Sequence, residues 1–179
     1  MRLFACIISL VFVSVVSKSQ SVYPVKAKFS IGLDGGLPVG SSNNRYNIMT
    51  GIFVQESVPI VKAIHITANL TYNKIKGRNN TEERNPNVIT YKYPDIDMIA
   101  AKAGIKYYIS PGLYLRGEAG AAVLESTVGF VYAPQIGYEF PINLAHNIDA
   151  AFRYEGSNHY RSEGYGSISL VSVRAAYVF

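Results

Sequence analysis

Apolar and polar residues alternate along most of the chain after Val25, with the period of two that a β-strand produces. The clearest stretch begins at Ile64: every second residue up to Tyr72 is apolar, and the residues between are polar. The same alternation occurs in six further segments, at residues 27–37, 99–108, 113–123, 130–140, 148–155 and 169–179. An eighth segment, at residues 48–58, alternates irregularly, so the pattern does not assign its two faces. The pattern predicts eight strands in a single domain.

The connections between these segments alternate in character. Those after the first, third, fifth and seventh segments span residues 40–47, 74–95, 124–127 and 156–164. Most of them are polar or charged, and the second is much the longest. The other three are shorter or turn-like, at residues 59–62, 110–112 and 141–147. An even number of strands joined in this way predicts an antiparallel, up-and-down arrangement of hairpins.

An apolar run near the start of the chain is typical of a cleavable signal peptide. Arg2 precedes fourteen uncharged residues, Leu3–Val16, and the small residues Ser17 and Ser19 follow. The run is shorter than the ~20 residues that a membrane-spanning helix needs. We therefore expect a signal peptide at residues 1–19 and a mature domain at residues 20–179.

Composition narrows the range of functions. Cys6 lies inside the expected signal peptide, so the mature domain has no cysteine for a disulfide, a zinc–thiolate site or a nucleophile. Without Arg2 and Lys18, the mature domain has 15 basic and 12 acidic residues and a net charge of +3. Such a mild, scattered charge argues against nucleic-acid binding, which uses clustered basic patches.

Two kinds of barrel fit eight alternating strands. In a soluble barrel the apolar face points inward, whereas in a membrane barrel the apolar face meets lipid and the polar face lines the interior. The polar face here carries six positive and five negative residues, separated by small residues, and this near balance suits an enclosed interior. We therefore predict a buried charge network of Lys28, Asp34, Lys102, Lys106, Arg116, Glu118, Glu139, Asp149, Arg153, Glu155 and Arg174.

Aromatic residues on the apolar face gather at the predicted strand ends. Amphipathic rings in these places are typical of the two girdles where a membrane barrel meets the bilayer surfaces. The set consists of Tyr72, Tyr107, Tyr132, Tyr138, Phe140, Tyr154, Tyr177 and Phe179. Together with the asymmetry of the connections, this pattern favours the membrane barrel over a soluble one.

The apolar N-terminal run, the eight alternating segments and the final strand ending in Phe179 resemble the small OmpA/OmpX-type outer-membrane β-barrels. The resemblance extends from Val25 to Phe179 and depends on pattern, with no specific motif. It implies an all-β, eight-stranded antiparallel up-and-down transmembrane β-barrel in the bacterial outer membrane, preceded by a cleavable signal peptide. It also implies that the last strand, with Tyr177 and Phe179, is the signal that the barrel assembly machinery reads.

The interior of an eight-stranded barrel is just wide enough for side chains to fill it. We therefore expect a plugged, non-enzymatic barrel with a structural or surface-interaction role, without catalytic residues, metal or cofactor. Its expected partners are outer-membrane lipid, the assembly machinery and a surface partner at the loop Lys74–Asp95, with no nucleic acid and a monomeric state. The alternatives are passage of a small hydrophobic compound through an opening near Gln55 and Glu56, and a soluble lipocalin-like periplasmic carrier.

Overall fold

The computed structural model describes residues 26–84, 87–124, 127–143, 145–161 and 164–179, and at residues 80–84, 87–92, 159–161 and 164–166 it describes only the backbone. The expected signal peptide lies outside these residues. The elements in chain order are β1 (Lys28–Pro38), the 3₁₀ helix η1 (Gly40–Asn44), β2 (Tyr46–Val61), β3 (Ile64–Gly77), β4 (Asn79–Arg84), β5 (Asn87–Lys92), β6 (Ile96–Tyr108), β7 (Leu113–Leu124), β8 (Thr127–Pro141), β9 (Asn147–Arg161) and β10 (Gly164–Val178).

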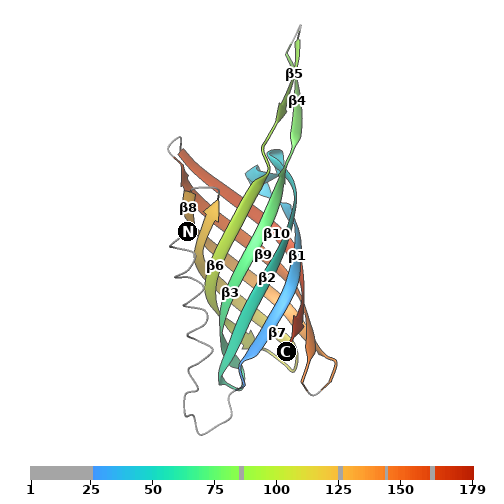
Figure 1. Cartoon of the computed structure of the whole chain (residues 1–179), viewed down its shortest axis with the longest axis vertical. Helices are drawn as coiled ribbons and strands as arrows, with labels where there is room; N and C mark the ends of the chain where they lie inside the picture. Colours follow the sequence, from blue (N-terminus) through green and yellow to red (C-terminus); the bar gives the residue numbers. More distant parts are fainter. Residues whose placement is uncertain (1–25, 85–86, 125–126, 144, 162–163) are drawn as a thin grey trace, which may run out of the picture.

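Eight of these strands form a closed barrel in the order β1-β10-β9-β8-β7-β6-β3-β2, with each neighbour antiparallel (Figure 1). The first and last strands of the barrel close it, and Asp34 of β1 lies opposite Arg174 of β10. Within the barrel, each strand pairs with the barrel strands before and after it in the chain, so the predicted eight-stranded, up-and-down topology is confirmed.

Side chains alternate between the outside and the inside of the barrel along each strand. The burial of β3 switches at every residue, with Ile64 and Ile66 exposed and His65 and Thr67 buried. The pattern also settles the faces of β2, where Met49, Phe53, Gln55 and Ser57 point inward. The alternation of β2 is irregular in the sequence because two of these inward residues, Met49 and Phe53, are apolar.

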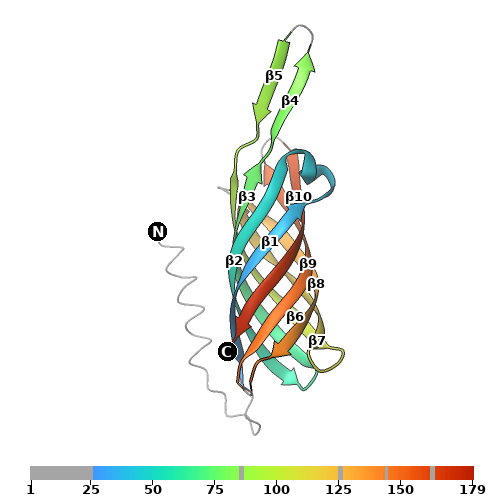
Figure 2. The same cartoon turned by 90° about the vertical axis from the view of Figure 1, so that its right-hand side faces the viewer.

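The two ends of the barrel differ (Figures 1 and 2). One end carries η1 and a two-stranded arm, β4–β5, that projects beyond the barrel in both views, and we call it the loop end. The opposite turn end carries the β2–β3, β6–β7 and β8–β9 connections and the C-terminus. In the described part of the chain, no helix is long and apolar enough to cross a membrane.

Two of the predicted loops are wrong. The segment 74–95 is mostly strand, because β3 continues to Gly77 and β4 and β5 pair into the arm, with Arg84 opposite Asn87. The segment 156–164 is also mostly strand, since β9 continues to Arg161 and pairs with β10 from Gly164 onward. Both segments are polar, and the sequence pattern reads polar stretches without alternation as loops.

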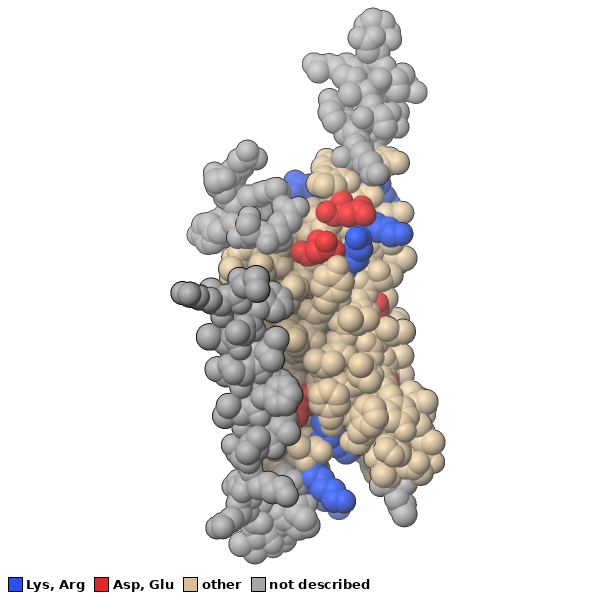
Figure 3. All heavy atoms as spheres, viewed as in Figure 1, with Lys and Arg blue, Asp and Glu red and all other residues tan. Residues whose placement is uncertain are grey.

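On the face of the barrel shown in Figure 3, the outer wall is apolar along its middle, and charged side chains gather toward its two ends. Among the residues whose side chains the structure describes, thirty-one large hydrophobic ones are exposed, including Leu33 at 65 % and Ile105 at 59 %. On β3 the outward residues change from Leu70 to Tyr72 and then to the exposed Lys74 toward the loop end. A wall of this kind meets hydrocarbon along its middle and polar headgroups where the aromatic and cationic residues begin.

Candidate functional site in the barrel interior

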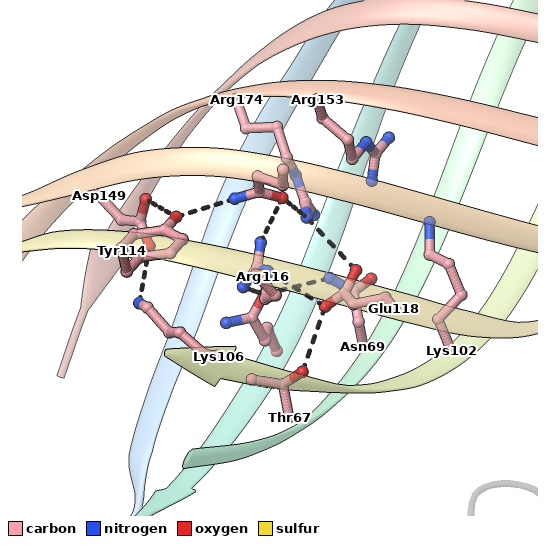
Figure 4. Close-up of polar contacts among 12 residues, drawn as sticks. Thr67, Asn69, Lys102, Lys106, Tyr114, Arg116, Glu118, Asp149, Arg153 and Arg174 are labelled. Carbon is pink, nitrogen blue, oxygen red and sulfur yellow. Dashed lines mark hydrogen bonds and ion pairs between the residues drawn. The ribbon is translucent and has the colours of Figure 1, made fainter. Parts of the chain in front are cut away.

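The middle of the barrel interior contains seven buried charged residues, which we call the central charge cluster. Each is at most 4 % exposed, and their side chains come from β1, β6, β7, β9 and β10. Figure 4 shows five of them: Lys102, Arg116, Glu118, Arg153 and Arg174. The members are Asp34, Lys102, Arg116, Glu118, Arg153, Glu155 and Arg174. Alternation brings these residues inside, because each one occupies an inward position of its strand.

Asp34 lies between two guanidinium groups. Its Oδ1 is 3.0 Å from Nε of Arg174, and its Oδ2 accepts a hydrogen bond of 3.1 Å from Nη2 of Arg153. The guanidinium carbon of Arg174 lies 3.5 Å from the centre of the Phe53 ring, which covers one face of the cation. Arg174 therefore points inward, where a carboxylate and an aromatic ring stabilise its charge.

The other two carboxylates of the cluster also face cations. Glu155 accepts a hydrogen bond from Lys102 and lies 3.5 Å from Nη2 of Arg153. Glu118 lies 3.4 Å from Nε of Arg116 and 4.0 Å from Nη1 of Arg174. Uncharged amides extend this network: Gln55 accepts from Arg116, and Gln135 accepts from both Arg116 and Arg174.

A second group of charges lies nearer the turn end and forms the turn-end charge cluster of Lys28, Lys106, Glu139 and Asp149. Glu139 is its centre, because its carboxylate accepts hydrogen bonds from Lys28, Lys106, Tyr108 and Asn147. These donors come from β1, β6 and β9, so one carboxylate on β8 ties together strands from several sides of the barrel. This cluster blocks the interior at the turn end.

The interior toward the loop end is apolar, which sequence reasoning did not predict. An inward cluster of apolar residues fills it, and we call this cluster the apolar interior layer. Its members are Tyr46, Met49, Ile75, Ile96, Met98, Ala100, Ala122, Leu124, Val131, Ile168 and Leu170. The sequence contained a signal for it, because Met98 and Ala100 share the face of Lys102, and Ala122 and Leu124 share the face of Glu118. The interior is therefore charged in one part and apolar in the other.

All eleven charged residues predicted to line the interior are placed there. Ten are buried, and Lys28, at the turn end, keeps a side chain that is 34 % exposed. The polar side chains Gln55, Asn69, Asn73, Tyr114 and Gln135 join them but were not predicted as site residues. The inward positions of Asn69, Asn73, Tyr114 and Gln135 could have been read from the alternation of β3, β7 and β8, but that of Gln55 on the irregular β2 could not. The partners of all five could not be read from the sequence.

Tyr177 and Phe179 lie on the outer wall at the turn end. Their rings pack edge to face, with centres 4.8 Å apart, and the backbone N–H of Phe179 donates to Phe29 of β1 across 2.8 Å. Both rings also contact His146 from the β8–β9 connection. The end of β10 is thus held against β1 and next to the neighbouring turn.

The described residues contain no group of three or more His, Asp or Glu side chains that could hold a metal ion. One hydroxyl near the loop end, Ser157, is buried and donates to the backbone carbonyl of Ile168 across 3.3 Å. Among the described residues, the histidine inside the barrel is His65, whose Nδ1 forms a hydrogen bond of 3.1 Å with the Ser57 hydroxyl near the turn end.

Sequence comparison with protein-family models finds no match, and comparison with curated proteins also finds none. Solved structures, by contrast, share the fold. The crystal structure of Ail, the attachment invasion locus protein of Yersinia pestis, matches with a TM-score of 0.53 and 14 % identity, over 88 % of this chain and all of that chain.

Two further Ail structures match this chain. Ail in complex with the heparin analogue sucrose octasulfate has a TM-score of 0.50 and 16 % identity, over 86 % of this chain and 97 % of that one. The backbone structure of Ail in a phospholipid bilayer nanodisc has a TM-score of 0.50 and 14 % identity, over 87 % of this chain and 99 % of that one. At this identity the likeness concerns the fold alone.

The closed eight-stranded barrel, its apolar exposed wall and its charged interior define the class of protein. The chain is a transmembrane β-barrel with the fold of the small, eight-stranded outer-membrane barrels of the OmpA/OmpX type. The soluble-carrier alternative is wrong, because a soluble barrel would point its apolar residues inward and its charges outward.

Proposed function

We propose that this protein is a non-enzymatic barrel of the bacterial outer membrane, exported through its signal peptide, that presents the β4–β5 arm to a partner at the cell surface. Longer loops of such barrels face the outside of the cell, whereas short turns face the periplasm. The loop end, with η1 and the arm, is then extracellular. The single observation that carries the proposal is the projection of the arm beyond the barrel (Figure 2).

The filled interior supports a role at the surface rather than in transport. The central and turn-end charge clusters occupy the middle and one end of the interior, and the apolar interior layer occupies the other end. Eight strands leave room for side chains but not for an aqueous channel. The loop end is therefore the part of the molecule that is available to partners outside the cell.

The backbone shows where the arm can be removed. The N–H of Tyr93 donates to the carbonyl of Arg78 across 3.1 Å, so the two residues are paired where the arm leaves the barrel. Replacing residues 79–92 by Asn-Gly should give a two-residue hairpin turn between them. The barrel ladders of β3 and β6 lie outside the deleted segment.

The test compares the attachment of bacteria that express the wild-type or the armless barrel to host cells and to each other. We expect the armless barrel to reach the outer membrane, with the heat-modifiable gel migration of a folded barrel, and to lose attachment. A barrel in which Ser41 and Asn43, exposed residues of η1 at the same end, are replaced by alanine serves as the control. Equal attachment of wild-type and armless barrels would contradict the proposal.

The apolar interior layer favours a second candidate function, passage of a small hydrophobic compound. The opening expected beside Gln55 and Glu56 has no structural support, because β2 is paired with β1 and β3 through both residues. The barrel ladder is instead interrupted between β8 and β9 at Pro134, which has no N–H to donate. Uptake of a labelled alkane by cells with and without the protein separates the two functions, since a surface-interaction barrel leaves uptake unchanged.

A further inference from the structure

The two interior charge clusters differ in their balance. The turn-end charge cluster has two cations, Lys28 and Lys106, and two carboxylates, Glu139 and Asp149. The central charge cluster has four cations but only three carboxylates. Its surplus positive charge lies among side chains that are at most 4 % exposed. An uncompensated charge in such a place is strongly unfavourable.

The same cluster contains hydrogen-bond donors without an acceptor. Nη1 of Arg153 and Nη2 of Arg174 are buried, and neither has a hydrogen-bond partner among the described residues. Both atoms belong to the guanidinium groups that hold the two oxygens of Asp34. Buried donors without acceptors are rare, because each one loses its bonds to water. The unpaired donors therefore belong to two cations of the same cluster that carries the surplus charge.

We propose that the central charge cluster binds one small inorganic anion, a halide such as chloride, at Arg153 and Arg174. One negative charge balances four cations against three carboxylates, and a halide accepts hydrogen bonds from several N–H groups at once. The Phe53 ring covers one face of Arg174 at 3.5 Å, and buried side chains surround the cluster. This enclosure favours a single-atom anion over a phosphate or a carboxylic acid.

The closed ends of the interior determine how the anion enters. Glu139 and its four hydrogen-bond donors lie on the turn-end side, and the apolar interior layer lies on the loop-end side. The anion is therefore enclosed as the barrel closes during folding and exchanges slowly afterwards. The salt present during refolding, rather than salt added later, decides whether the site is filled.

The test refolds the wild-type barrel from urea into detergent in sodium chloride, sodium bromide or sodium gluconate at one ionic strength. Gluconate is a much larger anion than a halide, and we expect the enclosed cluster to exclude it. We expect the melting temperature, followed by gel migration of the folded form, to be higher by about 3 °C or more in the halides than in gluconate. A crystal grown from the bromide sample should show an anomalous peak beside Arg153 and Arg174.

Two variants locate the effect. Lys102→Met leaves three cations and three carboxylates in the central charge cluster, and Glu155 keeps its contacts with Arg153 and Asn73. This variant should be insensitive to the kind of salt. Lys106→Met changes only the turn-end charge cluster, so it should keep the preference for halide even if it is less stable.

Two results would overturn the inference. The first is a wild-type melting temperature that is the same in all three salts, which would mean that the cluster needs no bound anion. The second is bromide crystals without an anomalous peak inside the barrel. The crystallographic readout on the wild-type protein does not depend on whether either variant folds.

Discussion

At the scale of the residue, the barrel interior shows how a small membrane protein keeps eleven charged side chains out of contact with lipid. Each carboxylate faces at least one cation, and most also accept a hydrogen bond from a neutral side chain. Charged hydrogen bonds of this kind are stronger than neutral ones, but removing one partner leaves the other buried and unpaired. The residue with the most partners should therefore be the most sensitive to substitution.

Glu139→Gln tests this argument. The substitution keeps the size of the side chain but removes the charge that faces Lys28 and Lys106. We expect the free energy of unfolding to fall by about 3–5 kcal/mol, because a buried ion pair is broken and a lysine stays behind. Urea unfolding in detergent, followed by gel migration, measures the change.

The control for this prediction is Glu56→Gln, which makes the same chemical change on the outer side of β2. No ion pair of Glu56 occurs among the described residues, so this variant should unfold close to the wild-type urea concentration. If both variants unfold at the same concentration, Glu139 does not have the central role that its hydrogen bonds indicate.

The sequence predicted which of these side chains point into the barrel better than it predicted which residues they contact. Period-two alternation alone puts Lys102 and Arg174 inside, because a strand has only two faces. That Asp34 and Arg174 are neighbours follows from the pairing of the last barrel strand with the first, which closes the barrel. The contact between Lys28 of β1 and Glu139 of β8 could not be predicted, because it crosses the interior between strands that are not adjacent.

At the scale of the element, strong alternation decided what could be predicted. The sequence assigned the two faces of seven of the eight barrel strands, but not those of β2. Met49 and Phe53 of β2 are apolar and point inward, and the sequence alone does not distinguish them from apolar residues that point outward. The arm was missed for a related reason. Its two strands pair only with each other, so their sequence is not constrained by a buried face.

The final strand β10 leads to the second prediction, which concerns assembly. Phe179 contributes a ring to a cluster with Tyr177 and Phe29 on the outer wall. If the assembly machinery reads this end of the strand, Phe179→Ala should lower the amount of folded barrel in the outer membrane several-fold. The same variant should refold in detergent almost as well as the wild type, because the machinery is absent there.

Phe140→Ala is the matched control. Phe140 also faces outward near the turn end, on β8, and its exposure of 51 % is close to the 52 % of Phe179. Losing this ring should affect stability to a similar degree without affecting assembly in the cell. Equal membrane levels of the two variants would show that Phe179 acts only as one more aromatic residue of the outer wall.

At the scale of the whole molecule, two different kinds of barrier close the interior in series. The charge clusters fill the middle and the turn end with paired ions, while the apolar interior layer excludes water toward the loop end. An ion that crossed the barrel would have to break the salt bridges and also leave its hydration shell. The architecture therefore predicts a barrel that does not conduct.

Planar-bilayer recordings test this closure, and the two barriers can be separated. Wild-type protein should show no stable open state. Met49→Ser with Met98→Ser makes the apolar interior layer polar, and it should stay closed because the charge clusters remain intact. Adding Glu139→Gln to these changes weakens the second barrier as well and should give brief openings. A stable open state of the wild-type barrel would contradict the closed interior, and openings of the methionine variant alone would show that the apolar interior layer is the only effective barrier.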